Sequence, residues 1–434
     1  MKAPGKRSKA AGQSSRMAKA APAARPIPAG PPKAVKAANE PIRALPPIPD
    51  PGPVRAFLEE EHVAFAAKIG AFAARELAPR VAPGDDAAAR KEARALHARQ
   101  SCPRIGSSQP PSPSRGQDWR ACCLAREALA AASPLADAVF ALQALGGVPL
   151  LLAGESPMRA RWVPEIIAGR AMAAFAMTEA EAGSDVAAIA TRAQRKGDAY
   201  VLSGAKTFIS NAGIADVYTV FASTDPAAGS RGISCFVVPA DTPGLRFVWP
   251  QILSAPHPLG EIAFEECRVP AANRLGEEGR GFALGLKTLD RLRATVGAAA
   301  CGMAARALAE ALAHAGARRQ FGKPLAEFQL VQEKLARMAT ELTAARLLVY
   351  RAAWEADRGA ARVTLEAAMA KAFATEAAQR IVDDAVQILG GAGVMASHPV
   401  DRLYRAVRAL GIYEGTTEIQ HLVIAQQLLR SGGA

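Results

Sequence analysis

The segment RKGDAYVLSGAKTFISN, residues 195–211, marks a change of texture in the middle of this chain. Its two runs, AYVLSG and KTFISN, are typical of strands, and Gly197-Asp198 is typical of a two-residue hairpin turn. Similar short β-rich runs, separated by Gly, Pro and Asn, fill residues 171–282; they are MAAFAM, DVYTVFAS, GISCFVVP and EIAFEECRV. Several short strands at this spacing predict a β-barrel or sandwich, and no βαβ alternation is visible.

Both flanks of this region have a helical pattern. Residues 54–81 and the chain from Ala283 onward place apolar side chains at intervals of three and four. Long helices are predicted over 284–314, 325–356 and 364–389, which suggests a helical bundle. The order of helices, strands and helices predicts an α+β protein. We divide it into a disordered basic tail (1–50), an N-terminal helical domain (51–170), a β-barrel domain (171–282) and a C-terminal helical domain (283–434).

Composition limits the classes of function. The chain has 434 residues, half of them hydrophobic, and a net charge of +13, of which the ten basic and two acidic residues of 1–50 supply +8. A tail rich in Ala, Pro and Lys cannot bury a core, so we interpret it as a solvated segment, with a transit peptide as the alternative. Nucleic-acid binding by this tail ranks third. No apolar run reaches about 18 residues, which argues against membrane insertion.

The six cysteines form no Cys-x-x-Cys pair and have no His cluster beside them. We therefore expect neither a metal site nor a disulfide framework, and we expect a reducing compartment. A bacterial cytoplasm fits this, or the mitochondrial matrix if the tail is a transit peptide.

Four motifs within 176–396 each allow a purely structural and a functional interpretation. AMTEAEAGSD (176–185) leaves a strand in a small-residue loop, which is either an ordinary turn or a place where backbone amides approach a ligand. KTFISNAG (206–213) is a half-buried strand end or an aromatic cover with a hydroxyl. RRQFGKPLAEFQ (318–329) is a turn between helices, and its arginines favour either the helix dipole or a phosphate. ILGGAGVMA (388–396) follows a helix rather than a strand, so it ends that helix and is not a dinucleotide fingerprint.

A fifth motif, IYEGTTEIQ (412–420), contains a carboxylate that helix capping leaves unexplained. Gly415 suits a chain break, either threonine could cap a new helix, and Glu418 suits its first turn. Glu414 has no such task. A carboxylate between apolar and aromatic neighbours is a candidate base with a raised pKa, because desolvation disfavours its charged form.

In this order and spacing, the five motifs resemble those of the acyl-CoA dehydrogenase family, from about Leu124 to Leu429, with a weaker helical match over 54–96. The likeness is to its short- and medium-chain-like members. It implies a helical N-terminal domain, a central β-barrel and a C-terminal four-helix bundle. It also implies an acyl-CoA substrate, FAD as cofactor, an electron-transfer flavoprotein as acceptor and a homotetramer or homodimer, with no nucleic acid as partner.

The resemblance assigns roles to individual residues. Glu414 matches the catalytic base, and Ser184, Asp290, Arg293 and Gly415 match substrate contacts. Leu292 occupies the position where some relatives carry the base instead, and leucine cannot serve as one. The positions that match FAD contacts, some of them to the FAD of a neighbouring subunit, are Met177, Thr178, Gly183, Ser184, Phe208, Ser210, Arg318, Gln329, Gln387, Leu389, Gly390, Gly391, Thr416 and Glu418.

The expected reaction is α,β-dehydrogenation of an acyl-CoA thioester to the trans-2-enoyl-CoA. Glu414 would take the α-proton while FAD accepts a hydride from the β-carbon, and the thioester carbonyl needs hydrogen bonds as the enolate develops. A free glutamate, with a pKa of about 4.3, is too weak a base, so desolvation must raise its pKa. The alternatives are a flavin oxidase or monooxygenase on the same fold, and a non-catalytic or impaired relative.

The last alternative arises from HARQSCPRIGSSQPPSPSRGQDWRACC, residues 97–123. This Ser/Pro-rich stretch interrupts a helical region, and a long structureless loop is unusual in a compact domain. Relatives have acidic, aromatic and paired glycine residues there, beside the acyl pocket. Its texture would suit a local frameshift in a GC-rich gene, a hypothesis that resequencing tests. The acyl group accepted by this chain is left open for the same reason.

Overall fold

The computed structural model describes residues 48–99, 118–153 and 156–431. These residues belong to one compact unit, Ile42–Ala434. Residues 1–47 of the predicted basic tail and residues 100–117 of the Ser/Pro-rich stretch lie outside the described residues.

The N-terminal part is helical, as predicted. Three of its helices begin at a side-chain cap: Asp118, Ser133 and Ser156 each accept a hydrogen bond from the backbone N–H three residues ahead. Where the pattern over 54–81 suggested helix, the structure has three short elements. The elements are η1 (Gly52–Phe57), α1 (Glu60–Phe72), the π-helical turn η2 (Ala73–Leu77), α2 (Asp86–Arg99), α3 (Trp119–Ala132), α4 (Pro134–Leu152) and α5 (Pro157–Ile167).

The central part is one eight-stranded sheet with the order β6-β7-β3-β2-β4-β5-β8, in which β1 pairs with β4. The pairs are antiparallel except β1 with β4 and one contact of β2 with β4. The strands are β1 (Ala173–Ala176), β2 (Arg192–Lys196), β3 (Ala199–Ser210), β4 (Val217–Ser223), β5 (Ile233–Pro239), β6 (Leu245–Pro250), β7 (Leu259–Pro270) and β8 (Arg274–Leu275). Short turns η3 (Val186–Ala188), η4 (Pro226–Gly232) and η5 (Ala271–Asn273) lie between them.

The predicted hairpin is confirmed, because Lys196 pairs with Ala199 across Gly197-Asp198. The two runs AYVLSG and KTFISN are not separate strands, since both belong to β3, with a change of register between Leu202 and Gly204. The sequence pattern did not reveal β6 or β8. β6 is an edge strand whose residues are mostly exposed, so it lacks the buried alternation that marks a strand.

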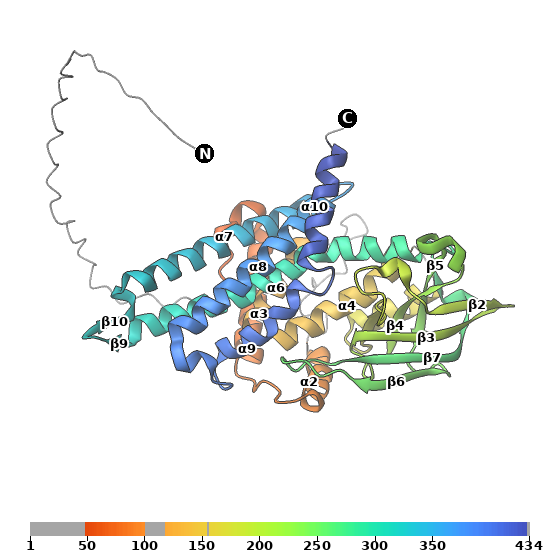
Figure 1. The fold of residues 1–434 in the computed structure, drawn as a ribbon, viewed down its shortest axis with the longest axis horizontal. Helices are drawn as coiled ribbons and strands as arrows, with labels where there is room; N and C mark the ends of the chain where they lie inside the picture. The colour runs from red at the N-terminus through yellow and green to blue at the C-terminus, as the bar shows by residue number, and fades with distance from the viewer. Residues whose placement is uncertain (1–47, 100–117, 154–155, 432–434) are drawn as a thin grey trace, which may run out of the picture. The chain divides into compact units, whose positions relative to one another are not determined.

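The C-terminal part is built on long helices, and Figure 1 shows α6, α7 and α8 lying together, with the sheet near one end of α6 and the β9–β10 hairpin at the other. α8 ends at Leu389 and Gly390 has φ +59°, so the glycines end a helix as predicted. The elements are α6 (Gly281–Ala317), β9 (Arg319–Gln320), β10 (Lys323–Pro324), η6 (Leu325–Glu327), α7 (Gln329–Asp357), α8 (Thr364–Leu389), η7 (Gly390–Val394), α9 (Pro399–Val407), η8 (Arg408–Gly411) and α10 (Thr417–Ser431).

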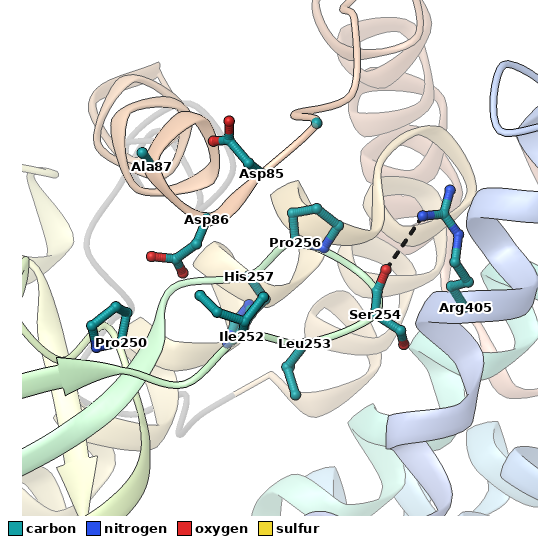
Figure 2. A pocket seen from close by; sticks show the side chains of 11 residues that line it. Asp85, Asp86, Ala87, Pro250, Ile252, Leu253, Ser254, Pro256, His257 and Arg405 are labelled. Carbon is teal, nitrogen blue, oxygen red and sulfur yellow. Dashed lines mark hydrogen bonds between the residues drawn. The ribbon is translucent and has the colours of Figure 1, made fainter.

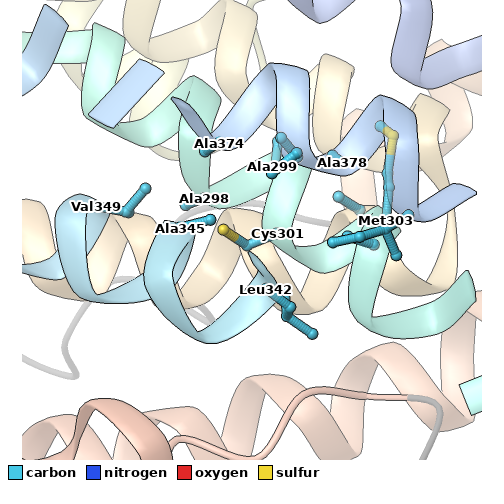
Figure 3. Packing of buried hydrophobic residues seen from close by; sticks show 14 of the residues in the cluster. Ala298, Ala299, Cys301, Met303, Leu342, Ala345, Val349, Ala374 and Ala378 are labelled. Carbon is cyan, nitrogen blue, oxygen red and sulfur yellow. The ribbon is translucent and has the colours of Figure 1, made fainter. Parts of the chain in front are cut away.

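Small side chains allow these helices to approach one another closely. A methyl group at Gly297 of α6 would lie 2.7 Å from a Val349 methyl of α7, so only glycine fits there. Figure 3 shows the surrounding core, in which alanines from three helices lie among a few larger side chains. The labelled residues are Ala298, Ala299, Cys301 and Met303 of α6, Leu342, Ala345 and Val349 of α7, and Ala374 and Ala378 of α8.

Two helices among the described residues, α4 and α6, would be able to cross a membrane if length and composition alone decided. In the structure, 56% and 72% of their apolar windows are buried inside the protein. Core helices of folded domains can have the same length and apolar composition, so these two helices are weak evidence for a membrane span.

Candidate active site

Glu414 lies in a tight turn between η8 and α10. Its φ is +54°, which is uncommon for a residue with a side chain, and Gly415 follows with φ +91°. A methyl group at Gly415 would lie 2.5 Å from the Gln420 amide nitrogen, and its positive φ is one that residues with a side chain rarely adopt, so the turn favours glycine. Thr416 Oγ accepts a hydrogen bond from the Ile419 N–H at 3.3 Å and caps α10, as predicted for one of the two threonines.

Two fully buried side chains hold this turn. Lys371 Nζ, from α8, donates to the Gly415 carbonyl at 2.7 Å. Gln420 Nε2 donates to the same carbonyl at 3.1 Å and to the Glu414 carbonyl at 3.3 Å. The sequence analysis identified neither residue. A single lysine on the apolar face of the predicted helix 364–389 was the signal that would have indicated Lys371.

The Glu414 carboxyl group is in an environment suited to a base. Its Oε2 atom is buried and makes no hydrogen bond within the described part of the chain. Burial raises the pKa of Glu414 above that of a free glutamate, and Arg126, Lys371 and Arg293 lower it in opposition. The expected raised pKa is therefore confirmed in direction, and the three cations keep the ionised form accessible.

Arg126 brings the N-terminal helices into this site. It lies on α3, is 2% exposed, and pairs with Asp137 of α4 through two hydrogen bonds of 2.8 and 2.9 Å. Its third nitrogen donates to Thr295 Oγ of α6 at 2.9 Å. Burial raises the pKa of the neighbouring Tyr413 hydroxyl, and Arg126 lowers it. Nothing in the local sequence distinguishes Arg126 from a surface arginine, and only its buried pairing shows its place.

The predicted substrate residues of α6 are close to this carboxyl group. Arg293 pairs with Asp290, whose second oxygen accepts a hydrogen bond from Thr364 Oγ at 3.0 Å. Arg293 lowers the pKa of Glu414, so its charge acts at the site. Leu292 is 3% exposed and belongs to the helical core, in keeping with its exclusion as a base.

The loop after β1 and the end of β3 are fixed to each other by a buried ion pair. Lys206 Nζ lies 2.6 Å from Glu179 Oε1 and donates to the Met177 carbonyl at 3.0 Å. The Thr207 N–H donates to the Thr178 carbonyl at 3.0 Å. Glu179 in turn accepts hydrogen bonds from the Ala190 and Thr191 N–H groups. The two motifs predicted to hold a flavin are therefore one structural unit.

This unit offers the surface that a flavin needs. Phe208 is 60% exposed and Ser184 is exposed, while a methyl group at Gly183 would meet no atom within 4 Å. An open aromatic face beside hydroxyls and free backbone fits the stacking and hydrogen bonding of an isoalloxazine ring. Met177 is buried, and its methyl carbon would lie 2.5 Å from a methyl group at Gly285, so the loop packs on α6.

The remaining predicted residues divide into two sets. Thr416 and Glu418 begin α10 beside the base. The other set lies at the far end of α6 and α8: Arg318, just past α6, is about 38 Å along this helix from Arg293, and Gln387 is about 24 Å along α8 from Lys371. One chain does not bring this second set to Glu414. Its members are Arg318, Gln329, Gln387, Gly390 and Gly391, which are exposed, and Leu389, which is buried.

Comparison with known proteins places this geometry in a family. The chain matches family models for the N-terminal domain (residues 59–170), the middle domain (174–267) and the C-terminal domain (279–429) of acyl-CoA dehydrogenases. The chain belongs to the acyl-CoA dehydrogenase family. This confirms the resemblance seen in the motifs, and the arrangement of a helical domain, a sheet domain and a second helical domain agrees with it.

Individual relatives of this acyl-CoA dehydrogenase family member extend the comparison. Probable acyl-CoA dehydrogenase FadE25 of Mycobacterium tuberculosis is 39% identical over 376 residues, which cover 86% of this chain and 96% of the relative. Cyclohexane-1-carbonyl-CoA dehydrogenase of Geobacter metallireducens is 41% identical over 310 residues, covering 71% and 81%.

Solved structures of similar chains have the same fold as this one. Butyryl-CoA dehydrogenase of Megasphaera elsdenii superposes with a TM-score of 0.78 at 35% identity, covering 86% of this chain and 99% of that one. A chain in a structure of the electron transferring flavoprotein of Acidaminococcus fermentans has a TM-score of 0.80 at 36% identity, again covering 86% of this chain and 99% of that one. The acyl-CoA dehydrogenase family is FAD-dependent, and a similar glutaryl-CoA dehydrogenase from Mycobacterium smegmatis was solved with FADH2.

Proposed function

We propose that this protein is an FAD-dependent acyl-CoA dehydrogenase in which Glu414 removes the α-proton of an acyl-CoA thioester. One observation carries the proposal: a buried Glu414 oxygen that has no hydrogen-bond partner among the described residues and lies among the charges of Arg126, Lys371 and Arg293. The flavin loop packs on Gly285 and Arg293 lies eight residues further along α6, about 12 Å. The base and the flavin-binding surface are therefore at the same end of this helix.

Individual residues of the chain would have the following roles in the reaction. FAD, when bound, supplies the acceptor for the hydride that leaves the β-carbon. The left-handed turn at Glu414 and Gly415 aims the carboxylate, and Lys371 and Gln420 keep the turn in place. The Glu414 backbone N–H would donate to the thioester carbonyl and stabilise negative charge on its oxygen. The product would be the trans-2-enoyl-CoA.

We assign FAD binding to residues from two copies of the chain. The loop from Met177 to Ser184, together with Phe208, Ser210 and Thr416, would hold the flavin of the same chain. The far-end set that includes Arg318, Gln329 and Gln387 is too distant for this and would bind the FAD of a neighbouring copy. A homotetramer, or a homodimer, follows from this division. The exposed apolar side chains at this end, Phe321 (93%) and Leu330 (80%), support such a contact.

An electron-transfer flavoprotein is the proposed acceptor of the electrons. A chain similar to this one occurs in a structure of the electron transferring flavoprotein of Acidaminococcus fermentans, which supports this assignment. For the substrate we commit to the class of acyl-CoA thioesters, because residues 100–117, which match positions that border the acyl pocket in relatives, lie outside the described residues.

The test is anaerobic bleaching of the purified yellow protein with a panel of acyl-CoA thioesters. Wild type should lose its flavin absorbance with at least one thioester, whereas Glu414→Gln should bind FAD and bleach at least a thousandfold more slowly. Glu333→Gln, on the exposed part of α7, is the matched control and should bleach like wild type. Equal bleaching by wild type and Glu414→Gln would contradict the assignment of the base, and rapid reaction of the reduced protein with oxygen would favour an oxidase.

A further inference from the structure

Ser210, at the end of β3, has a partner that the sequence did not indicate. Its Oγ atom lies 2.8 Å from Nε2 of His257, in the segment that connects β6 to β7. Ser210 is one of the residues assigned above to the flavin, and the family resemblance matches it to the hydroxyl residue beside the reactive nitrogen of the ring. A serine hydroxyl has one donor and two acceptor positions and rotates freely unless a neighbour fixes it. His257 therefore occupies one of the hydrogen-bonding positions of this hydroxyl.

The segment that carries His257 is anchored to β3 on both sides. Gln251 accepts a hydrogen bond from the Phe208 N–H at 2.8 Å and donates to Thr207 Oγ at 2.7 Å. After the histidine, the Pro258 carbonyl accepts the Asn211 N–H at 2.9 Å. The histidine is flanked by two prolines, whose fixed backbone angle reduces its freedom further. The imidazole is consequently held against Ser210 by the fold.

The imidazole is neutral and faces a pocket. Burial lowers the pKa of His257 to about 4, Arg90 lowers it further and Asp86 raises it, so at neutral pH Nε2 either donates or accepts. Figure 2 shows the pocket of about 530 Å³ that His257 lines. The pocket is lined by three segments: the chain before and at the start of α2, the β6–β7 segment, and Arg405 of α9.

We propose that His257 is a positioning residue for the flavin reaction: it orients the Ser210 hydroxyl so that one fixed hydrogen bond is directed at the reactive nitrogen of the ring. The proposal rests on the proposed function, since it needs FAD beside Ser210. Where Nε2 accepts the hydroxyl proton, that proton is fixed on the imidazole and the Ser210 Oγ lone pairs accept from the N–H that the reactive nitrogen carries in the reduced ring. Without His257 the hydroxyl is free, and the reduced form of the bound flavin becomes less favoured.

The experiment measures the midpoint potential of bound FAD in an anaerobic dye titration, with FAD content determined for every variant. His257→Phe keeps a ring but removes the hydrogen bond, and we expect a tenfold loss in the reduced-to-oxidised ratio, which is a shift of about −30 mV for a two-electron couple. Ser210→Ala should give the same shift. The double variant should shift no further than Ser210→Ala, because the two residues act as one unit.

Two variants separate this role from a purely structural one. His257→Gln places an amide group at a similar reach, whose oxygen can accept the Ser210 hydroxyl proton, and should restore most of the wild-type potential, which a mere packing role would not predict. Ser254→Ala changes a residue of the same segment. Within the described part of the chain only the Ser254 backbone carbonyl is hydrogen-bonded, to Arg405, so this variant should leave the potential unchanged.

The outcomes are distinguishable. Wild-type protein without FAD would overturn the proposed function and this inference together. Two results with FAD-loaded variants would overturn the inference alone. One is an unchanged midpoint potential for His257→Phe. The other is a shift for His257→Gln as large as that of Ser210→Ala. If His257→Phe does not fold, the Gln and Ser210→Ala variants still decide, because the inference requires the first to resemble wild type and the second to shift.

Discussion

Replacing Lys206 with methionine tests whether the flavin loop depends on a buried ion pair. The Lys206 ammonium is fully buried and contacts Glu179 Oε1 at 2.6 Å and the Met177 carbonyl at 3.0 Å. Burial lowers the pKa of Lys206 to about 8, so the ammonium is still charged at pH 7. Lys206→Met removes one charge of the pair and leaves the other, Glu179, inside the protein.

The expected loss in the free energy of unfolding depends on the hydrogen bonds that Glu179 retains in this variant. Breaking a buried ion pair by removing one partner costs about 3–5 kcal/mol. Glu179 is 8% exposed and still accepts N–H hydrogen bonds from Ala190 and Thr191, so we expect the lower end, about 3 kcal/mol. The double variant Lys206→Met/Glu179→Gln should regain a large part of this loss, because the remaining group is no longer charged.

The assay is denaturant unfolding of the FAD-loaded chain at pH 7, with release of FAD followed in parallel. Lys206→Met should unfold at a lower midpoint and release FAD earlier, since Lys206 also holds the Met177 carbonyl. Lys196→Met, on the exposed strand β2, is the matched control and should stay within about 0.5 kcal/mol of wild type. The reasoning is refuted if Lys206→Met behaves like Lys196→Met, or if the double variant loses the sum of the two single losses.

Three further predictions follow from the same geometry. Lys371 lowers the pKa of Glu414, so Lys371→Met should move the acid limb of the pH dependence of flavin reduction to higher pH; a limb that stays in place would contradict the role of Lys371. Gly415→Ala puts a side chain at φ +91°, a cost of about 1–2 kcal/mol, and should slow flavin reduction roughly 5–30-fold with FAD content unchanged. The folded chain loses the Lys206 proton at about pH 8 and the unfolded chain near 10.5, so between these values the unfolded state binds more protons and this lysine makes stability rise with pH; unfolding titrations of Lys206→Met should lack this contribution.

Local signals in the sequence were enough for the order of helices and strands and for the turn at Glu414. The hairpin at Gly197-Asp198, the helix end at Gly390 and the cap at Thr416 all involve neighbours within a few residues. The strand β6 was missed because it lies at an edge of the sheet with most of its side chains exposed, so burial leaves no alternation to recognise.

By itself, then, the sequence determined the family, the layered order of its parts and the identity of the carboxylate. Only the tertiary structure decided what surrounds that carboxylate: Lys371, Arg126 and Arg293 come from α8, α3 and α6, far apart in the chain. The physical reason is that the interactions of a buried charge depend on distance and burial rather than on sequence separation. The sequence does not distinguish a lysine or arginine that faces solvent from one that pairs with a carboxylate in the core. Only folding determines which of the two environments the side chain has.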